Sequence, residues 1–106
     1  MTKYKVAELE GALLDAAVAL AEAHPLTRGR WPYSTDWQFG GPIIEREQIA
    51  IVENGYKRTE WDAYVRGRYS QDDFLDGDGF ASGPTPLIAA MRAYVASKFG
   101  DEVELP

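Results

Sequence analysis

Cysteine is absent from this 106-residue sequence, and histidine occurs once, at position 24. Without cysteine there is no disulfide framework, no thiolate metal ligand and no cysteine nucleophile. A single histidine leaves any transition-metal site dependent on carboxylates, which is uncommon, and it argues against a Ser-His-Asp catalytic arrangement. We therefore expect neither a bound metal nor a cofactor.

Positive charge is also scarce, with 11 Lys and Arg against 17 Asp and Glu, a net charge of −6 and a pI near 4.7. Binding to a nucleic-acid backbone needs a positive field, so nucleic acid is not the expected partner. Long apolar runs are missing too, and the first residues lack the pattern of a signal peptide. The sequence predicts a cytoplasmic protein that makes no membrane contact.

Apolar residues are plentiful at 45%, with 12% aromatics, enough to build the core of one domain spanning 1–106. A first helix is predicted over residues 6–24 and ends before Pro25. Its expected apolar stripe consists of Val6, Leu9, Leu13, Ala16, Ala17 and Leu20. His24 stands at the end of this helix, where a capping or solvated role is favoured over that of a general base.

A second helix is predicted after residue 85, with clear signals at both ends. Thr85 is a preferred N-cap type, Pro86 suits the first helical position, and Gly100 suits the residue after the helix. The expected apolar stripe consists of Leu87, Met91, Tyr94, Val95 and Phe99.

Residues 48–53 and 57–69 read as paired strands around the Asn54-Gly55 turn signal. A two-residue loop would place Ile51 opposite Arg58, with charge on the core face. A three-residue loop pairs Ile51 with Thr59 and Ile49 with Trp61, so we predict an odd-length loop. The expected fold is α+β: a single two-layer domain with two amphipathic helices packed on a small antiparallel sheet built on this central hairpin.

Two stretches rich in glycine and proline interrupt these elements. Residues 25–42 read as an ordered loop, and residues 70–83 as an acidic, glycine-rich loop. The segment DDFLDGDG at 72–79 resembles a calcium loop, but aligning Gly79 with its invariant glycine leaves Phe74 and Pro84 at ligand positions. We expect a dispensable, solvated loop without a tight metal, and leave weak cation binding open.

Two other patterns carry less specific signals. Gly40-Gly41-Pro42 is not followed by a phosphate-binding motif, so a turn is favoured. A basic set with one aromatic lies on the predicted strand at Lys57, Arg58, Tyr64, Arg66 and Arg68. Glu60 and Asp62 interrupt this face, which favours cross-strand ion pairs. Weak binding of single-stranded nucleic acid through residues 57–68 stays an alternative.

The segment 33–47, YSTDWQFGGPIIERE, combines aromatic anchors with charged neighbours, as binding surfaces often do. We predict a partner-facing surface there, formed by Tyr33, Asp36, Trp37, Gly40, Gly41, Glu45, Arg46 and Glu47. One alternative is an enzyme that acts on a small polar substrate with the carboxylates of Asp36, Glu45 and Glu47. Glu45 and Glu47 would share one face of a strand. Another is that Trp37 plugs the open side of the sheet.

The blocks YSTDW, GGPIIERE and TPLIAAMRAYVASKFGDEVE, in this order, resemble the NinX-like family of phage and prophage proteins, whose function is unknown. The resemblance runs from about Leu9 to Glu104. The family brings no assigned catalytic residues. The resemblance implies a phage or prophage accessory protein in a bacterial host cell. We expect a non-enzymatic interaction module with a host or phage protein as its partner, and leave a homo-oligomer open.

Overall fold

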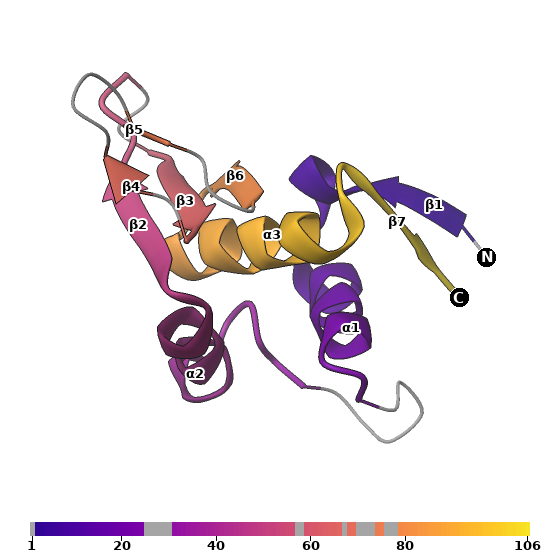
Figure 1. The fold of residues 1–106 in the computed structure, drawn as a ribbon. Coiled ribbons are helices and arrows are strands. Elements are labelled where there is room, and N and C mark those ends of the chain that lie inside the picture. The colour runs from indigo at the N-terminus through magenta and orange to yellow at the C-terminus, as the bar shows by residue number, and fades with distance from the viewer. Residues whose placement is uncertain (1, 25–30, 57–58, 67, 70–73, 76–78) are drawn as a thin grey trace.

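A computed structural model describes residues 2–24, 31–56, 59–66, 68–69, 74–75 and 79–106 (Figure 1). Its helices are η1 (Val6–Glu8), α1 (Gly11–Ala21), α2 (Trp37–Glu47) and α3 (Pro86–Phe99). Its strands are β1 (Thr2–Lys5), β2 (Ile49–Glu53), β3 (Trp61–Val65), β4 (Arg68–Tyr69), β5 (Phe74–Leu75), β6 (Gly79–Gly83) and β7 (Glu102–Leu105). This arrangement confirms the α+β class.

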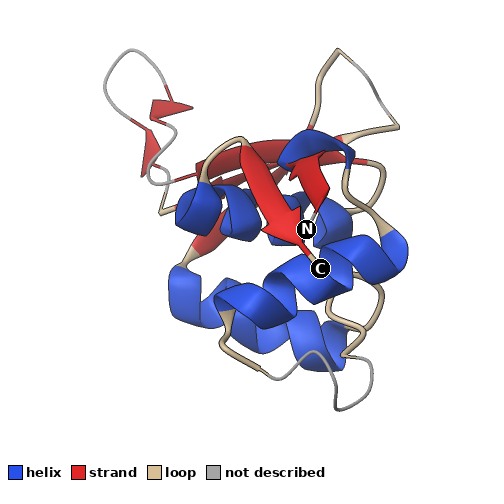
Figure 2. Ribbon diagram, turned by 90° about the vertical axis from the view of Figure 1, so that its right-hand side faces the viewer, coloured by secondary structure: helices blue, strands red, loops and turns tan. Residues whose placement is uncertain are grey.

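The strands form three antiparallel sheets: β2-β3-β6, the terminal ribbon β1-β7, and the short pair β4-β5. α3 packs against β2, β3 and β6 and also contacts α1 and α2. Figure 1 shows α3 running between the three-stranded sheet and these two helices, and Figure 2 shows the sheet along one side of the molecule. The two helices expected from sequence are thus present, and α2 is an additional one.

The central position of α3 explains its composition, because the helix is apolar on several sides rather than along one stripe. Every residue from Ala89 to Val95 is buried. The helix approaches β6 so closely that a Cβ added at Gly79 would lie 2.6 Å from the Ala93 carbonyl oxygen. The predicted N-cap is confirmed, since the Thr85 hydroxyl accepts a hydrogen bond from the Ile88 amide at 3.0 Å.

The hairpin has the predicted parity but a different register. Ile49 lies opposite Val65, Ile51 opposite Ala63, and Glu53 opposite Trp61. Residues 54–60 therefore connect the strands, an odd number as the side-chain phase requires. The three-residue loop and the pairing of Ile51 with Thr59 and of Ile49 with Trp61 are wrong. Moving the register by an even number of residues keeps the same side chains on the core face.

The first helix begins later than predicted, at Gly11 instead of residue 6. Residues 2–5 form β1, η1 follows, and Glu10 is fully extended before the helix starts. Because Val6 and Leu9 lie outside α1, they do not define its inner face. The buried face carries Leu14, Ala17 and Val18, whereas Leu13 and Leu20 are exposed, so the predicted stripe has the wrong phase.

Part of the segment predicted as a loop over 25–42 is helical, and its residues 25–30 lie outside the described part. α2 includes Gly40, Gly41 and Pro42. Three glycine and proline positions in a row normally argue against a helix. This helix instead depends on its Asp36 cap and on tertiary packing of Gly40, Ile43 and Glu47, all buried.

The predicted loop over 70–83 is also partly wrong, because Gly79–Gly83 forms β6 in the main sheet and Phe74–Leu75 forms β5. The four aspartates of the 72–79 stretch lie outside the described residues, so the expectation about cation binding stays untested. In the described ranges, no helix has the length and apolar character needed to cross a membrane.

The terminal ribbon was not predicted from the sequence. Thr2 pairs with Leu105 and Lys5 with Glu102, so the two ends of the chain lie side by side. Val103 and Leu105 are buried, and the glutamates between and beside them are exposed. This alternation over 102–105 is the signal that could have identified β7.

Candidate functional site

Trp37 is the most exposed aromatic side chain of the segment 33–47, with 53% of its surface accessible. It is the first residue of α2, and the Asp36 carboxylate caps this helix by accepting a hydrogen bond from the Gln38 amide at 2.9 Å. A shallow hollow of about 270 Å³ adjoins it. The hollow is lined by Ser34, Thr35, Trp37, Thr85, Pro86, Leu87 and Ile88.

The hollow lies where the beginnings of two helices meet. The cap of α2 holds Trp37 in place, and the cap of α3 does the same for Pro86 and Leu87. Gly40 brings the two helices together, because a Cβ there would lie 2.5 Å from both the Tyr33 carbonyl oxygen and Leu87 Cδ1. Trp37 therefore stands on a rigid surface. It does not plug the open side of the sheet.

The other predicted surface residues are divided between interior and exterior. Tyr33, Gly40 and Glu47 are buried, so they cannot present a side chain to a partner. Trp37, Glu45 and Arg46 are exposed, and Asp36 and Gly41 are partly so.

The predicted acid/base pair at residues 45 and 47 is not formed. Glu45 and Glu47 lie on a helix and not on a strand, so they do not share a face. The carboxylates of Asp36, Glu45 and Glu47 are thus not brought together in one pocket.

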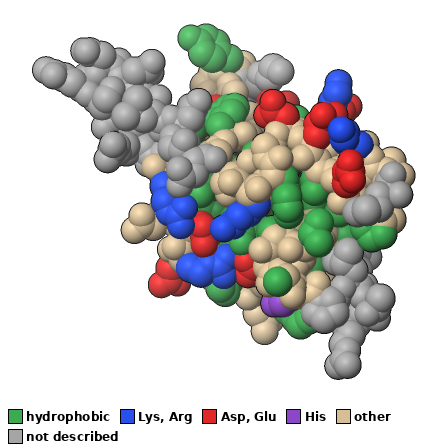
Figure 3. All heavy atoms as spheres, turned by 45° about the vertical axis from the view of Figure 1, so that its right-hand side comes forward, with side chains coloured by type: hydrophobic (Ala, Val, Ile, Leu, Met, Phe, Trp, Pro, Cys, Tyr) green, Lys and Arg blue, Asp and Glu red, His purple; other side chains and the backbone are tan. Residues whose placement is uncertain are grey.

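Arg46 is the centre of a polar network that joins all three α-helices. Its two terminal nitrogens donate to the Glu22 carboxylate at 3.0 and 2.6 Å, and its Nε donates to Glu47 at 2.7 Å. The Tyr94 hydroxyl accepts from Arg46 at 3.1 Å and donates to Glu22. Arg66 donates to the other oxygen of Glu47 at 3.0 Å. In Figure 3, Lys and Arg side chains alternate with Asp and Glu on this side of the molecule.

The network shifts the acid–base properties of its members. Hydrogen bonds from Arg46 hold the pKa of the Glu22 and Glu47 carboxyls below the usual value, against the opposing effect of burial. Burial and the hydrogen bond to Glu22 raise the pKa of Tyr94. Both carboxylates are thus ionised and paired at neutral pH. This arrangement stabilises the fold and leaves neither one as a free general base.

His24 is held in an aromatic cluster after α1. Its Nδ1 and the Tyr33 hydroxyl form a hydrogen bond of 2.5 Å, and its ring lies 4.9 Å from that of Trp31. Its backbone amide donates to the Ala19 carbonyl, and Ala23 has a positive φ of 59°, which together form a Schellman cap. The backbone of His24 thus caps the helix, but its imidazole, predicted to cap or to be solvated, is bonded to Tyr33 instead.

Sequence reasoning missed Asp15, a buried carboxylate on α1. It accepts hydrogen bonds from the Ser34 amide and hydroxyl at 2.9 and 2.7 Å. These bonds tie the segment before α2 to α1, and so they help to fix Trp37. An aspartate between Leu14 and Ala16 on a predicted helix could have been identified as a polar residue on an apolar face.

The basic strand face predicted as an alternative site is only partly described. Arg66 is bound to Glu47, and the Tyr64 ring lies 4.9 Å from that of Phe80. Lys57, Arg58 and the side chain of Arg68 lie outside the described part. Within the described ranges, no three His, Asp or Glu side chains gather as they would around a metal ion.

The fold and the surface together define a small α+β protein. Arg46 connects its three α-helices through hydrogen bonds, and Trp37 is exposed where α2 and α3 begin. Residues 29–98, about two thirds of the chain, match the family described as Bacteriophage P22, NinX. The chain belongs to this family of phage proteins. No curated protein sequence matches it significantly. The matched range includes α2, β2, β3, β6 and nearly all of α3.

Proposed function

We propose that this phage accessory protein acts by binding another protein, of host or phage origin, through the surface centred on Trp37. The observation that carries the proposal is the exposure of this ring on a rigid scaffold beside the hollow at the start of α3. Tryptophan is among the residues most enriched at the energetic centres of interfaces, since it buries a large apolar area with little loss of side-chain freedom.

The surroundings of Trp37 have the composition of an interface rim. Thr35 and Thr85 are exposed hydroxyl residues at the edge of the hollow, and Ile88 and Pro86 are partly buried. An apolar side chain of a partner would enter the hollow beside the indole ring. The hydroxyls and exposed Gln38 would provide hydrogen bonds around it.

A non-catalytic role is favoured because two of the three acidic residues of the segment 33–47 already have structural partners, and Glu45 does not share a pocket with them. Asp36 caps α2, and Glu47 is bound by Arg46 and Arg66. A catalytic carboxylate needs an oxygen that is not already engaged by structural partners, so that it can accept a proton from the substrate.

The test is affinity capture from phage-infected host cells with the intact protein as bait, followed by titration of the purified partner. Trp37→Ala is expected to weaken binding by about 30-fold or more, which corresponds to the roughly 2 kcal/mol that defines an interface hot spot. Because the ring is half exposed, the variant should still unfold cooperatively, within about 1–2 kcal/mol of the parent.

The matched control is Tyr56→Ala, since the Tyr56 side chain is fully exposed in the hairpin connection. This variant should bind the partner as the parent does. Asp36→Ala is not a suitable probe, because loss of the cap would itself cost about 0.5–2 kcal/mol. Equal binding by the Trp37→Ala variant and the parent would contradict the proposal.

A further inference from the structure

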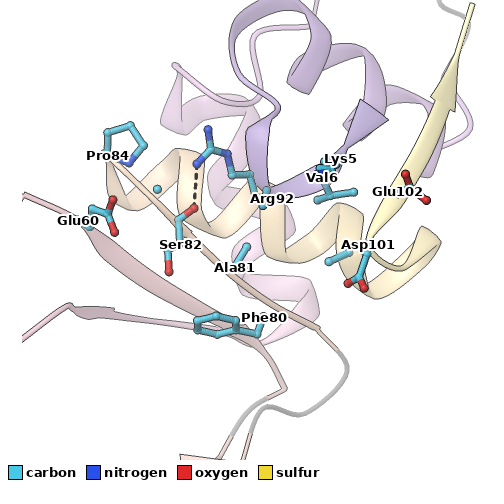
Figure 4. Close-up of a pocket in the computed structure, with 13 residues that line it drawn as sticks. Lys5, Val6, Glu60, Phe80, Ala81, Ser82, Pro84, Arg92, Asp101 and Glu102 are labelled. Atoms are coloured by element: carbon cyan, nitrogen blue, oxygen red, sulfur yellow. Dashed lines mark hydrogen bonds between the residues drawn. The ribbon is translucent and has the colours of Figure 1, made fainter. Parts of the chain in front are cut away.

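A second candidate site lies farther along α3, beside the free edge of β6. A groove of about 620 Å³ runs there between β6 and the segment that joins β1 to η1 (Figure 4). Arg92 and Ala96, one turn apart on α3, form its floor. Figure 4 shows Phe80, Ser82 and Pro84 along one wall, with Val6 and Asp101 on the opposite one.

The edge of β6 that faces the groove is available for pairing. β6 is hydrogen-bonded to β3 on one side, and within the described ranges no strand pairs with its other side. The Ser82 carbonyl accepts from Arg92, so the backbone of Ser82 points away from β3. Backbone direction alternates along an antiparallel strand. The amide and carbonyl of Phe80 therefore face the same free edge.

Arg92 is a buried cation that makes no direct ion pair with a described residue, although the charges of Glu10 and Glu60 act on it from farther away. Only 9% of its surface is accessible. Its Nε donates to the Leu9 carbonyl at 2.7 Å and one terminal nitrogen donates to the Ser82 carbonyl at 2.9 Å. Both acceptors are neutral. The second terminal nitrogen makes no hydrogen bond to a described residue. Burial lowers the pKa of Arg92, and Glu10 and Glu60 offset this only from a distance, so an anion in direct contact with the guanidinium would be favoured here.

The other residues that line the groove indicate the size and the charge of the ligand. Val6, Ala7, Phe80, Ala81 and Ala96 make the walls apolar and allow small side chains to fit. Glu60 lies near one end of the groove, and Lys5, Asp101 and Glu102 lie near the other. The two ends together carry three carboxylates and one lysine, so they disfavour a ligand with several negative charges. One carboxylate near the middle is the charge that the groove complements.

We propose that this groove binds an extended peptide segment with small apolar residues and a single carboxylate, whose backbone pairs with β6 at Phe80 and whose carboxylate pairs with Arg92. Addition of a strand to an exposed sheet edge supplies affinity through main-chain hydrogen bonds, and the side-chain contacts supply specificity. The bidentate geometry of a guanidinium matches a carboxylate. This site is independent of the surface around Trp37.

The experiment is an NMR titration of the isotopically labelled full chain with the capped peptide acetyl-Ala-Val-Asp-Val-Ala-amide. The matched probe replaces aspartate by asparagine, and a third peptide is methylated on alternate backbone nitrogens. We expect saturable shifts of the Phe80 and Ser82 amides with the first peptide. The asparagine and methylated peptides should bind at least tenfold more weakly.

Two variants keep the test independent of folding defects. Arg92→Gln should lose the preference for aspartate over asparagine, but it also alters two internal hydrogen bonds. Ala96→Glu leaves those bonds in place and puts a carboxylate one turn from Arg92, so it should compete with the peptide and weaken binding at least tenfold. Trp37→Ala should bind the peptide as the parent does, which separates this proposal from the proposed function.

Three outcomes would overturn the proposal. The first is the absence of shifts at Phe80 and Ser82 at millimolar peptide, and the second is equal binding of the aspartate and asparagine peptides. The third is that sodium propionate alone produces the same shifts with the same affinity as the peptide. That result would assign the groove to small organic acids instead of a peptide strand.

Discussion

Arg46 makes more structural contacts than its exposed position on α2 suggests. Half of its side chain is accessible, yet it binds Glu22 after α1, Glu47 at the end of α2 and Tyr94 on α3. The two carboxylates are much less accessible than the arginine. Ion pairs with partly buried members are less screened by water than those on an open surface. We infer that this network stabilises the packing of the three helices.

The first prediction concerns the acid stability of this network. The pKa values of Glu22 and Glu47 are lowered from 4.5 in the folded protein. Below about pH 4.5 the unfolded state therefore binds more protons, and the free energy of unfolding falls as the pH decreases. The Glu22→Gln/Glu47→Gln variant should be less stable at pH 7 by about 1–3 kcal/mol. Its loss of stability between pH 5 and about pH 3 should be smaller than that of the parent.

Urea denaturation at a series of pH values measures both effects. Glu45→Gln is the control, because the exposed Glu45 forms no ion pair with any described residue. It should retain the acid dependence of the parent. Parallel stability curves for the parent and the double variant would show that other carboxylates cause the acid sensitivity.

At the scale of elements, α2 is the helix that the sequence pattern did not predict. Gly40, Gly41 and Pro42 predict a turn, and only the fold shows why a helix forms. Gly40 is required by the close approach of Leu87 and the Tyr33 backbone, whereas a Cβ at Gly41 would meet nothing within 4 Å. The two adjacent glycines therefore have different roles, although they are indistinguishable in the sequence.

The second prediction compares these two glycines. Gly40→Ala should lower the free energy of unfolding by about 1–3 kcal/mol, since the added methyl group would overlap a backbone oxygen. Gly41→Ala should raise it by about 0.5–1 kcal/mol, because alanine is the better helix former and the position is open. Thermal or urea unfolding of both variants gives the measurement. Similar effects of the two substitutions would contradict the packing of α2 against α3.

Local sequence signals predicted some elements correctly. They failed where contacts between distant parts of the chain determine the structure. The ends of α3 were predicted because Thr85, Pro86 and Gly100 act within one turn of the helix. The parity of the hairpin was predicted because side chains alternate strictly along a strand. The start of α1, by contrast, depends on the pairing of residues 2–5 with residues 102–105, which no local pattern shows.

The candidate site was predicted in the same uneven way. Trp37 was identified from the composition of the segment 33–47, which combines aromatic and charged residues. Its exposure agrees with a surface role. Glu47 was assigned to that surface because the segment was read without α2, whose turn buries it. Tyr33 precedes this helix and is buried by its contacts with His24 and Phe39. Arg92 was missed altogether. Nothing in the sequence of α3 distinguishes an arginine bound to two remote carbonyls from one that extends into solvent.

At the scale of the whole molecule, the terminal ribbon closes the structure. β7 contacts α1, and η1 contacts both α3 and β6, so the ribbon is attached to the main core. Leu105 and Val103 contribute buried apolar side chains from the last residues of the chain. We therefore expect the ribbon to unfold together with the rest of the domain.

The third prediction tests this cooperativity. Leu105→Ala should cost about 2–5 kcal/mol, as expected for the removal of a fully buried leucine side chain. Glu104→Ala, at the exposed neighbouring position, should change the stability by less than about 0.5 kcal/mol. Both values follow from urea unfolding monitored by tryptophan fluorescence. An effect of Leu105→Ala below about 0.5 kcal/mol would mean that the ribbon frays independently of the core.

The pairing of β1 with β7 also orders events during synthesis of the protein. The ribosome makes β7 about a hundred residues after its partner β1. Until β7 emerges, the backbone groups of β1 have no strand to pair with, and Val6 lacks the Asp101 carbonyl that accepts its amide. Closing so long a loop is entropically costly and slows folding. The nascent chain can thus assemble α3 on the three-stranded sheet first, but the ribbon forms only after β7 has left the ribosome.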